Sequence, residues 1–131
     1  MLQPKVYIRS LYKVLEVELI NFDEKTVEIY DDDYMDFEDP SIGFKCYSFD
    51  EVEFMENTGL KDKNGNYIYE GDIVTVNGTW NCIIEYNQSS CAFVLKSIDS
   101  RWSTGYFSNY DDIEEMLEVI GNVYENEELA E

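Results

Sequence analysis

Polar and apolar residues alternate with a period of two along most of this chain, and this pattern constrains the fold more than any other feature. The alternation is clear in residues 13–20 and returns in residues 25–30, and a turn is predicted between them at residues 21–24. A period of two places successive side chains on opposite faces of a strand, which indicates strands with one buried face. The two segments are therefore predicted to form an antiparallel hairpin.

Further short strands are predicted by the same pattern in residues 44–47, 51–55, 67–69, 73–76, 80–86, 91–96, 101–107 and 118–124. Asn64-Gly65 and Asn77-Gly78 predict tight hairpin turns, in which both central residues adopt positive φ angles, and residues 87–90 close a third hairpin. Residues 31–40 are predicted to be a loop, because six closely spaced acids and a proline do not fit a sheet interior.

One helix is predicted, over residues 111–117. Acidic residues occupy its first turn, where the helix dipole favours negative charge, and Ile113, Met116 and Leu117 share one side. With so many short strands, we expect an all-β (mainly β) protein. Gly71-Asp72 before an alternating run is common at the start of SH3-like barrels. We place such a barrel at residues 58–131, packed with an N-terminal β subdomain at residues 1–57.

The charge of the chain excludes several functions. Nine Lys and Arg residues stand against 29 Asp and Glu residues, for a formal net charge of −20. Direct nucleic-acid binding and binding to anionic membranes both require a basic surface that this composition cannot supply. No segment approaches the ~20 apolar residues of a membrane helix. The first residues do not have the pattern of a secretory signal, so we expect a cytoplasmic location.

The absence of histidine removes imidazole-based catalysis and histidine metal ligation. The cysteines Cys46, Cys82 and Cys91 form no Cys-x-x-Cys pair, and Cys82 and Cys91 lie in alternating apolar runs, where they are expected to be buried. A reactive thiol is the weaker alternative. The sequence therefore predicts no catalytic residues, no cofactor site and no metal site, and the protein is expected not to be an enzyme.

Three features of the sequence resemble functional sites, and each also has a simpler structural explanation. Asp62-x-Asn64-x-Asn66 resembles part of a calcium loop, but a calcium loop has Gly and Glu where this chain has Tyr67 and Ile73. Paired carboxylates could serve glycoside hydrolysis, although 29 acids produce close pairs by number alone. A set of aromatic residues predicts a filled core or an oligomer interface, or alternatively a stacking platform for a sugar or a peptide. This set comprises Trp80, Trp102, Tyr106, Phe107 and Tyr110.

Two segments resemble a known family. Residues 58–74, TGLKDKNGNYIYEGDIV, are similar to a segment of YopX-like proteins, which are small proteins encoded by phages and prophages. Residues 118–126, EVIGNVYEN, resemble the closing segment of that family. The resemblance also includes residues 51–55 and is weaker in the first 50 residues, where Arg9 is present without the family's Trp. Glu127 replaces a frequent proline. The resemblance implies a β-rich fold with an SH3-like barrel and a phage or prophage origin, and it implies no activity.

We therefore expect a non-enzymatic accessory protein that binds a protein partner and self-associates as a homo-oligomer. The alternative is an acidic DNA mimic that occupies the basic groove of a host DNA-binding enzyme. Twenty charges match about 34 Å of duplex DNA, at one charge per ~1.7 Å. A mimic requires most acids on one face, whereas the negative charge is divided equally between the two predicted parts.

Overall fold

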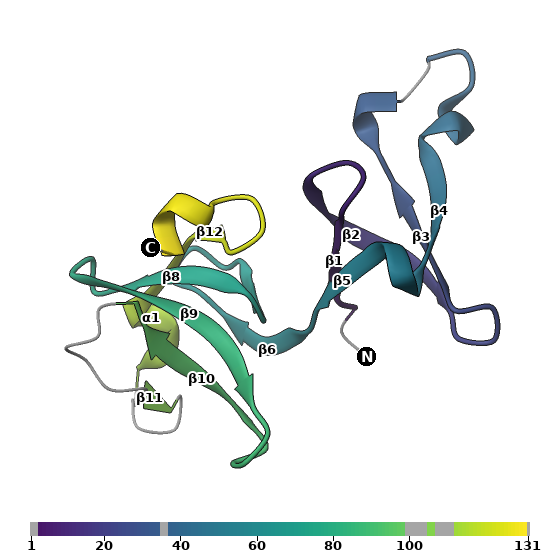
Figure 1. Ribbon diagram of the computed structural model, residues 1–131. Helices are drawn as coiled ribbons and strands as arrows, with labels where there is room; N and C mark the ends of the chain where they lie inside the picture. The colour runs from purple at the N-terminus through teal and green to yellow at the C-terminus, as the bar shows by residue number, and fades with distance from the viewer. Residues whose placement is uncertain (1–2, 35–36, 99–104, 107–111, 131) are drawn as a thin grey trace. The chain divides into compact units, whose positions relative to one another are not determined.

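The computed structural model describes residues 3–34, 37–98, 105–106 and 112–130 (Figure 1). The chain forms two compact units, unit 1 at Met1–Met55 and unit 2 at Glu56–Glu131. Each unit has a hydrophobic core of its own. In the sequence, the boundary between the two units falls two residues before the predicted boundary between residues 57 and 58.

Unit 1 is a five-stranded antiparallel sheet with the strand order β4-β3-β2-β1-β5. Its strands are β1 (Lys5–Ile8), β2 (Lys13–Asn21), β3 (Thr26–Tyr30), β4 (Phe44–Ser48) and β5 (Val52–Met55). Three short 3₁₀ turns connect them, namely η1 (Asp32–Tyr34), η2 (Pro40–Gly43) and η3 (Phe49–Glu51). The alternating side chains of the strands meet in the core, which comprises Val6, Ile8, Val17, Val27, Ile29 and Val52.

Unit 2 contains a second five-stranded antiparallel sheet, in the order β11-β10-β9-β8-β12, and a separate two-stranded sheet of β6 and β7. Its strands are β6 (Asn57–Lys61), β7 (Tyr67–Tyr69), β8 (Asp72–Val76), β9 (Trp80–Asn87), β10 (Ala92–Ser97), β11 (Gly105–Tyr106) and β12 (Leu117–Asn122). Helix α1 (Ile113–Met116) precedes β12, and the 3₁₀ turn η5 (Glu127–Ala130) follows it.

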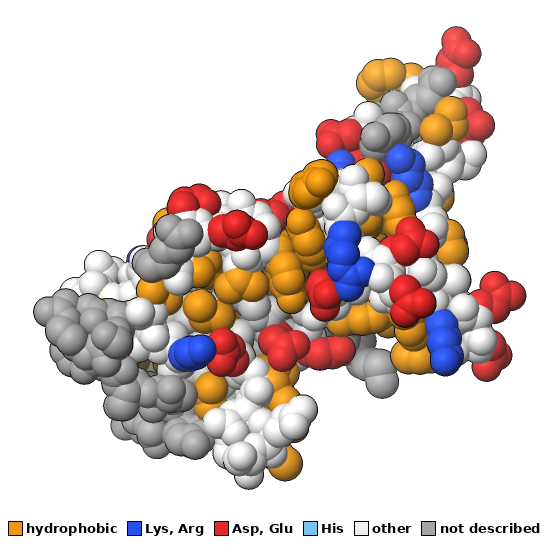
Figure 2. Space-filling model, viewed as in Figure 1, with side chains coloured by type: hydrophobic (Ala, Val, Ile, Leu, Met, Phe, Trp, Pro, Cys, Tyr) orange, Lys and Arg blue, Asp and Glu red, His pale blue; other side chains and the backbone are white. Residues whose placement is uncertain are grey.

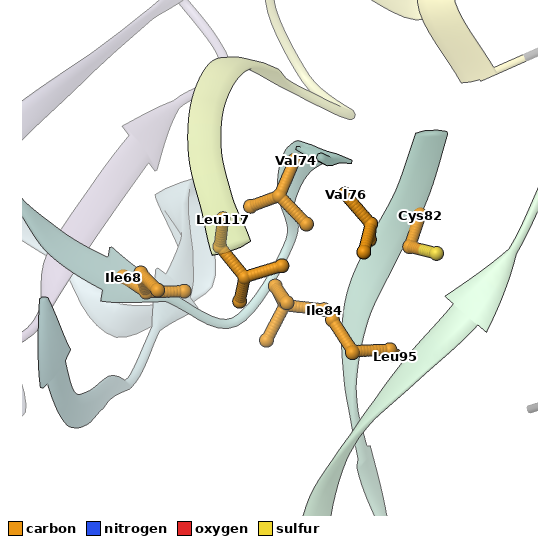
Figure 3. Close-up of a cluster of buried hydrophobic side chains, with 7 residues drawn as sticks. All are labelled: Ile68, Val74, Val76, Cys82, Ile84, Leu95 and Leu117. Carbon is orange, nitrogen blue, oxygen red and sulfur yellow. The ribbon is translucent and has the colours of Figure 1, made fainter. Parts of the chain in front are cut away.

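The core of unit 2 joins side chains from both of its sheets. Ile68 of β7 and Leu117 of β12 point toward the side chains of β8, β9 and β10, as Figure 3 shows. The complete cluster comprises Ile68, Val74, Val76, Cys82, Ile84, Leu95 and Leu117. Because β7 contributes Ile68, the β6–β7 hairpin is held to the larger sheet by apolar burial.

The two five-stranded sheets have the same connectivity. In each, four strands follow one another as a meander, and the fifth returns to pair with the first: β5 pairs with β1, and β12 pairs with β8. A short helical turn precedes the returning strand in both units, η3 in one and α1 in the other.

The all-β class is confirmed. Closure into an SH3-like barrel stays a prediction, because no ladder between described residues joins the two edge strands of either sheet.

Most of the predicted strands are present, with small changes at their ends. The predicted helix at residues 111–117 is shorter, because Leu117 already belongs to β12. The strand predicted at residues 101–107 is described only as β11, and its other residues lie outside the described ranges. The loop prediction for residues 31–40 agrees with the absence of strands in the described part of that segment.

Two details of the prediction were wrong. Asn77 and Gly78 have the expected positive φ angles of 51° and 71°, but at the other Asn-Gly pair only Gly65 has a positive φ, of 84°. There the carboxylate of Asp62 binds the loop backbone and changes the form of the turn. Cys82 is buried as predicted, whereas Cys91 is exposed, because it lies at the end of the β9–β10 turn with a φ of 53°.

Candidate functional site

An open cavity of about 370 Å³ lies in unit 2 and is lined by Glu56, Asn57, Glu70, Tyr86 and Phe93. Binding sites for small molecules commonly measure ~300–1,000 Å³, so this cavity is at the small end of that range. Its lining combines two carboxylates with two aromatic rings. We call it the acidic pocket.

The aromatic wall of the acidic pocket is a pair of facing residues on one hairpin. Tyr86 of β9 and Phe93 of β10 are direct partners in the strand register. Their ring centroids are 5.4 Å apart with an interplanar angle of 68°, which is an edge-to-face arrangement. Both lie two residues from core positions, Ile84 and Leu95, and so share the core face of the sheet. Phe93 packs partly against the core, and Tyr86 is 43% exposed.

The acidic wall comes from the ends of the β6–β7 hairpin. Glu56 immediately precedes β6 and Glu70 immediately follows β7, and the Glu70 N–H donates to the Glu56 carbonyl oxygen at 2.8 Å. Burial raises the pKa of the Glu70 carboxyl, and the negative charges of Glu56 and Glu85 raise it further. Hydrogen bonds from the backbone N–H groups of Glu56 and Tyr86 oppose this rise without cancelling it.

The described lysine and arginine residues do not neutralise the two carboxylates of the acidic pocket. Glu85 forms an ion pair with Lys96 across β9 and β10, at 3.5 Å. Within the described ranges, neither Glu56 nor Glu70 is paired with a lysine or arginine. The pocket therefore places negative charge beside aromatic rings, an arrangement that attracts cationic groups.

Among the described residues that line the pocket, none is a serine, threonine, cysteine or lysine. Across the described residues, no group of three or more potential ligands is arranged to hold a metal ion. The described lining offers negative charge and aromatic surface, two features that proteins use to recognise ligands.

The predicted calcium-like segment has a structural role instead. Asp62 is 4% exposed, and its Oδ1 accepts hydrogen bonds from the backbone N–H groups of Asn64 and Asn66 at 3.0 and 2.9 Å. Its Oδ2 accepts from the N–H of Val119 on β12 at 3.0 Å. Burial alone would raise the pKa of Asp62, but these donors outweigh it and lower the pKa. Both carboxylate oxygens are thus used in holding the loop to β12.

The acidic segment after β3 contains one buried acid that the sequence did not reveal. Asp31 is 1% exposed. The ammonium group of Lys13 donates a hydrogen bond to Oδ1 of Asp31 at 2.7 Å and another to Oδ2 of Asp33 at 2.8 Å. The hydrogen bond with Asp31, followed by that with Asp33, raises the pKa of Lys13, and the Lys13 hydrogen bond lowers the pKa of Asp33. This trio joins β2 to the end of β3.

Of the aromatic set expected from the sequence, only part lies in the described residues. Trp80 packs against the core of unit 2, and Tyr106 belongs to β11. Trp102, Phe107 and Tyr110 lie outside the described residues. Tyr86 and Phe93 were missed, although two aromatics on either side of the predicted turn at residues 87–90 are the signal that could have identified them.

Acidic side chains are scattered over the face shown in Figure 2. In each unit they lie singly or in small groups among hydrophobic and other side chains, and on this face they do not gather into one continuous acidic surface. None of the described helices is long and apolar enough to cross a membrane.

The fold and the pocket define a small all-β protein with two compact antiparallel units. The chain belongs to the YopX protein family, whose model matches residues 12–131. The match extends through most of unit 1, where the sequence motifs resemble the family least. Among solved structures, protein EF1440 from Enterococcus faecalis is similar, with a TM-score of 0.59 and 22% identity over 98% of this chain and 97% of that chain. This likeness supports the fold alone. No curated protein matches the chain.

Proposed function

We propose that this YopX-family protein is a non-enzymatic accessory protein that binds a protein partner through the acidic pocket of unit 2. The observation that supports the proposal is the lining of the pocket, in which two carboxylates without a described lysine or arginine partner lie beside a cross-strand aromatic pair. Aromatic side chains that remain partly exposed are common where proteins bind one another, because they bury a large area at little entropic cost. The phage or prophage origin implied by the sequence resemblance belongs to the same proposal.

The acidic DNA mimic is the second candidate. A net charge of −20 supports it, because that charge is comparable with about ten base pairs of duplex DNA. A mimic needs its charges ordered along one face, and the face shown in Figure 2 has no such ordered row of acids. Self-association is a further part of the proposal, supported by sheet edges and by Phe22 and Phe37, which are 74% and 92% exposed.

The proposal is tested by selecting a displayed library of random peptides against the full chain and against a Tyr86→Ala variant. We expect a family of peptides that binds the wild-type protein and is depleted at least about tenfold on the variant. Phe22→Ala, which removes an exposed ring from unit 1, is the matched control and should retain the same peptides. Circular dichroism verifies that both variants are folded.

Two outcomes would contradict the proposal. One is the absence of any enriched peptide that depends on Tyr86. The other is enrichment of polybasic peptides that bind the Tyr86→Ala variant equally well and are lost at high salt, which would support the DNA mimic, because binding driven by general surface charge is screened by salt.

A further inference from the structure

We infer that the acidic pocket receives a single arginine side chain of the bound partner. This inference rests on the proposed function and adds the chemistry of the ligand. It is argued from the charge, the aromatic wall and the size of the pocket.

The negative charge of the acidic pocket favours a cationic ligand. Glu56 and Glu70 line the cavity without a lysine or arginine partner in the described part of the chain, and the nearby Glu85 is paired with Lys96 at 3.5 Å. The burial of Glu70 and the negative charge of Glu56 disfavour the ionised form of its carboxyl. A bound cation would relieve both effects, because it would place a positive charge beside the two carboxylates. A phosphate or carboxylate ligand would be repelled.

The aromatic wall favours a cation that is also planar. Tyr86 and Phe93 meet edge to face at 5.4 Å, and Tyr86 keeps 43% of its surface exposed toward solvent. A guanidinium group stacks on aromatic rings and is less strongly hydrated than an ammonium group. It also presents paired N–H groups that fit a carboxylate. An arginine side chain can therefore stack on the aromatic wall and donate hydrogen bonds to the acidic wall at the same time, whereas lysine interacts as a point charge.

The size of the pocket limits the ligand to about one side chain. A cavity of about 370 Å³ that is open to solvent is small for a cofactor but sufficient for a long side chain entering from a partner. A divalent cation fits less well, because only two carboxylates line the cavity and the described residues form no group of three ligands. The partner segment therefore contributes one arginine at this position.

The test uses the full chain labelled with ¹⁵N and two small probes, N-acetyl-arginine amide and its neutral isostere N-acetyl-citrulline amide. We expect the arginine probe to shift the amide signals of Glu70, Tyr86 and Phe93 in a saturable way. The citrulline probe should bind at least about tenfold more weakly, which corresponds to about 1.4 kcal/mol. Equal binding of the two probes, or shifts confined to other residues, would overturn the inference.

A charge variant separates the pocket from the general negative field of the protein. Glu70→Gln should weaken binding of the arginine probe about tenfold, whereas Glu16→Gln, which removes an exposed acid of unit 1, should leave it unchanged. An equal effect of the two variants would contradict the inference. The comparison of arginine with citrulline on the wild-type protein remains decisive if Glu70→Gln does not fold.

Two further results separate this inference from the proposed function. Tyr86-dependent library peptides that lack arginine would leave the proposed function intact and overturn the arginine assignment. Signals of the pocket that shift with protein concentration in the absence of any probe would assign the pocket to a second copy of the chain and overturn it as well. Failure to select any peptide, combined with saturable binding of the arginine probe, would contradict the proposed function and support the ligand chemistry.

Discussion

Asp62 is a buried carboxylate whose two oxygens accept three backbone N–H groups, from Asn64, Asn66 and Val119. Replacing it with asparagine would place an amide N–H₂ where one oxygen now accepts, and leave a buried donor facing another donor. We expect Asp62→Asn to lower the free energy of unfolding of unit 2 by about 1–3 kcal/mol. Asp112→Asn is the control, because the side chain of Asp112 makes no capping hydrogen bond. Urea denaturation followed by tryptophan fluorescence measures both variants, since Trp80 and Trp102 belong to unit 2.

The same residue gives the stability of unit 2 a predictable dependence on pH. The pKa of Asp62 is lower in the folded protein than its ordinary value of 3.8, so the unfolded chain takes up a proton more readily. The contribution of Asp62 is therefore complete above about pH 4 to 5 and is lost as the pH falls through the lower folded value. In Asp62→Asn this part of the acid dependence should be absent. An unchanged acid profile would show that the three hydrogen bonds do not stabilise the carboxylate.

Gly121 is required by a close approach in the closing motif. A Cβ atom at this position would lie 2.6 Å from Oδ1 of Asn126, the atom that accepts the N–H of Asn122 at 3.1 Å. We expect Gly121→Ala to cost about 1 kcal/mol through loss of that hydrogen bond. Asn126→Ala should cost less in the Gly121→Ala background than in the wild type, because the shared interaction has already been removed. Additive costs in this double-mutant cycle would contradict the explanation.

At the scale of elements, β12 is the strand that completes the core of unit 2. Leu117 is fully buried at its start, and its carbonyl oxygen accepts the N–H of Lys63 at 2.9 Å. Leu117→Ala should lower the free energy of unfolding by about 2–5 kcal/mol, as expected when a large core side chain is truncated. Ile120→Ala on the same strand removes a side chain that is 36% exposed and should cost less than about 1 kcal/mol. Equal costs, again measured by urea denaturation and tryptophan fluorescence, would mean that β12 does not close this core.

The sequence predicted the long strands well because alternation survives in them without interruption. Strands β2, β3, β9 and β10 all appear close to their predicted ranges. Strand β6 was missed, because Gly59 interrupts the apolar pattern with a φ of 84° and the register with β7 is irregular. The missed strand has a consequence for the candidate site. Without the β6–β7 pairing, the sequence gives no reason to place Glu56 beside Glu70.

There is a different reason why the sequence did not predict the aromatic wall of the acidic pocket, formed by Tyr86 and Phe93. Alternation assigns Tyr86 and Ile84 to the same face of β9, but it does not show where along that face the core ends. The burial of Ile84 and the partial exposure of Tyr86 depend on which elements cover each end of the hairpin. In the same way, Asp31 belongs to an acidic run that alternation cannot resolve, and its ion pair with Lys13 of β2 is a contact that the alternation does not show.

At the scale of the whole molecule, the rates at which the three cysteines react with a thiol reagent can show whether the two units open separately. Cys46 of unit 1 and Cys91 of unit 2 are exposed, whereas Cys82 is buried in the core of unit 2, and burial raises the pKa of its thiol. We expect a thiol reagent to label Cys46 and Cys91 quickly and Cys82 only as unit 2 opens. Mass spectrometry after timed labelling, with peptide mapping, measures the three rates.

Core variants then test whether the units unfold independently. Leu117→Ala should accelerate labelling of Cys82, because it destabilises the unit that buries this thiol. Ile29→Ala removes a fully buried side chain from unit 1 and should leave the rate of Cys82 unchanged. Equal acceleration by both variants would show that the two units open as one.

The return of the fifth strand to the first in each sheet also affects how the chain can fold during its synthesis. Every strand that β1 pairs with lies before Glu56, so the N-terminal unit has all its partners as soon as its own residues leave the ribosome. Translation adds about 5–20 residues per second, which leaves this unit several seconds to form before the second is complete. A nascent chain arrested after the first unit can therefore already contain a finished domain.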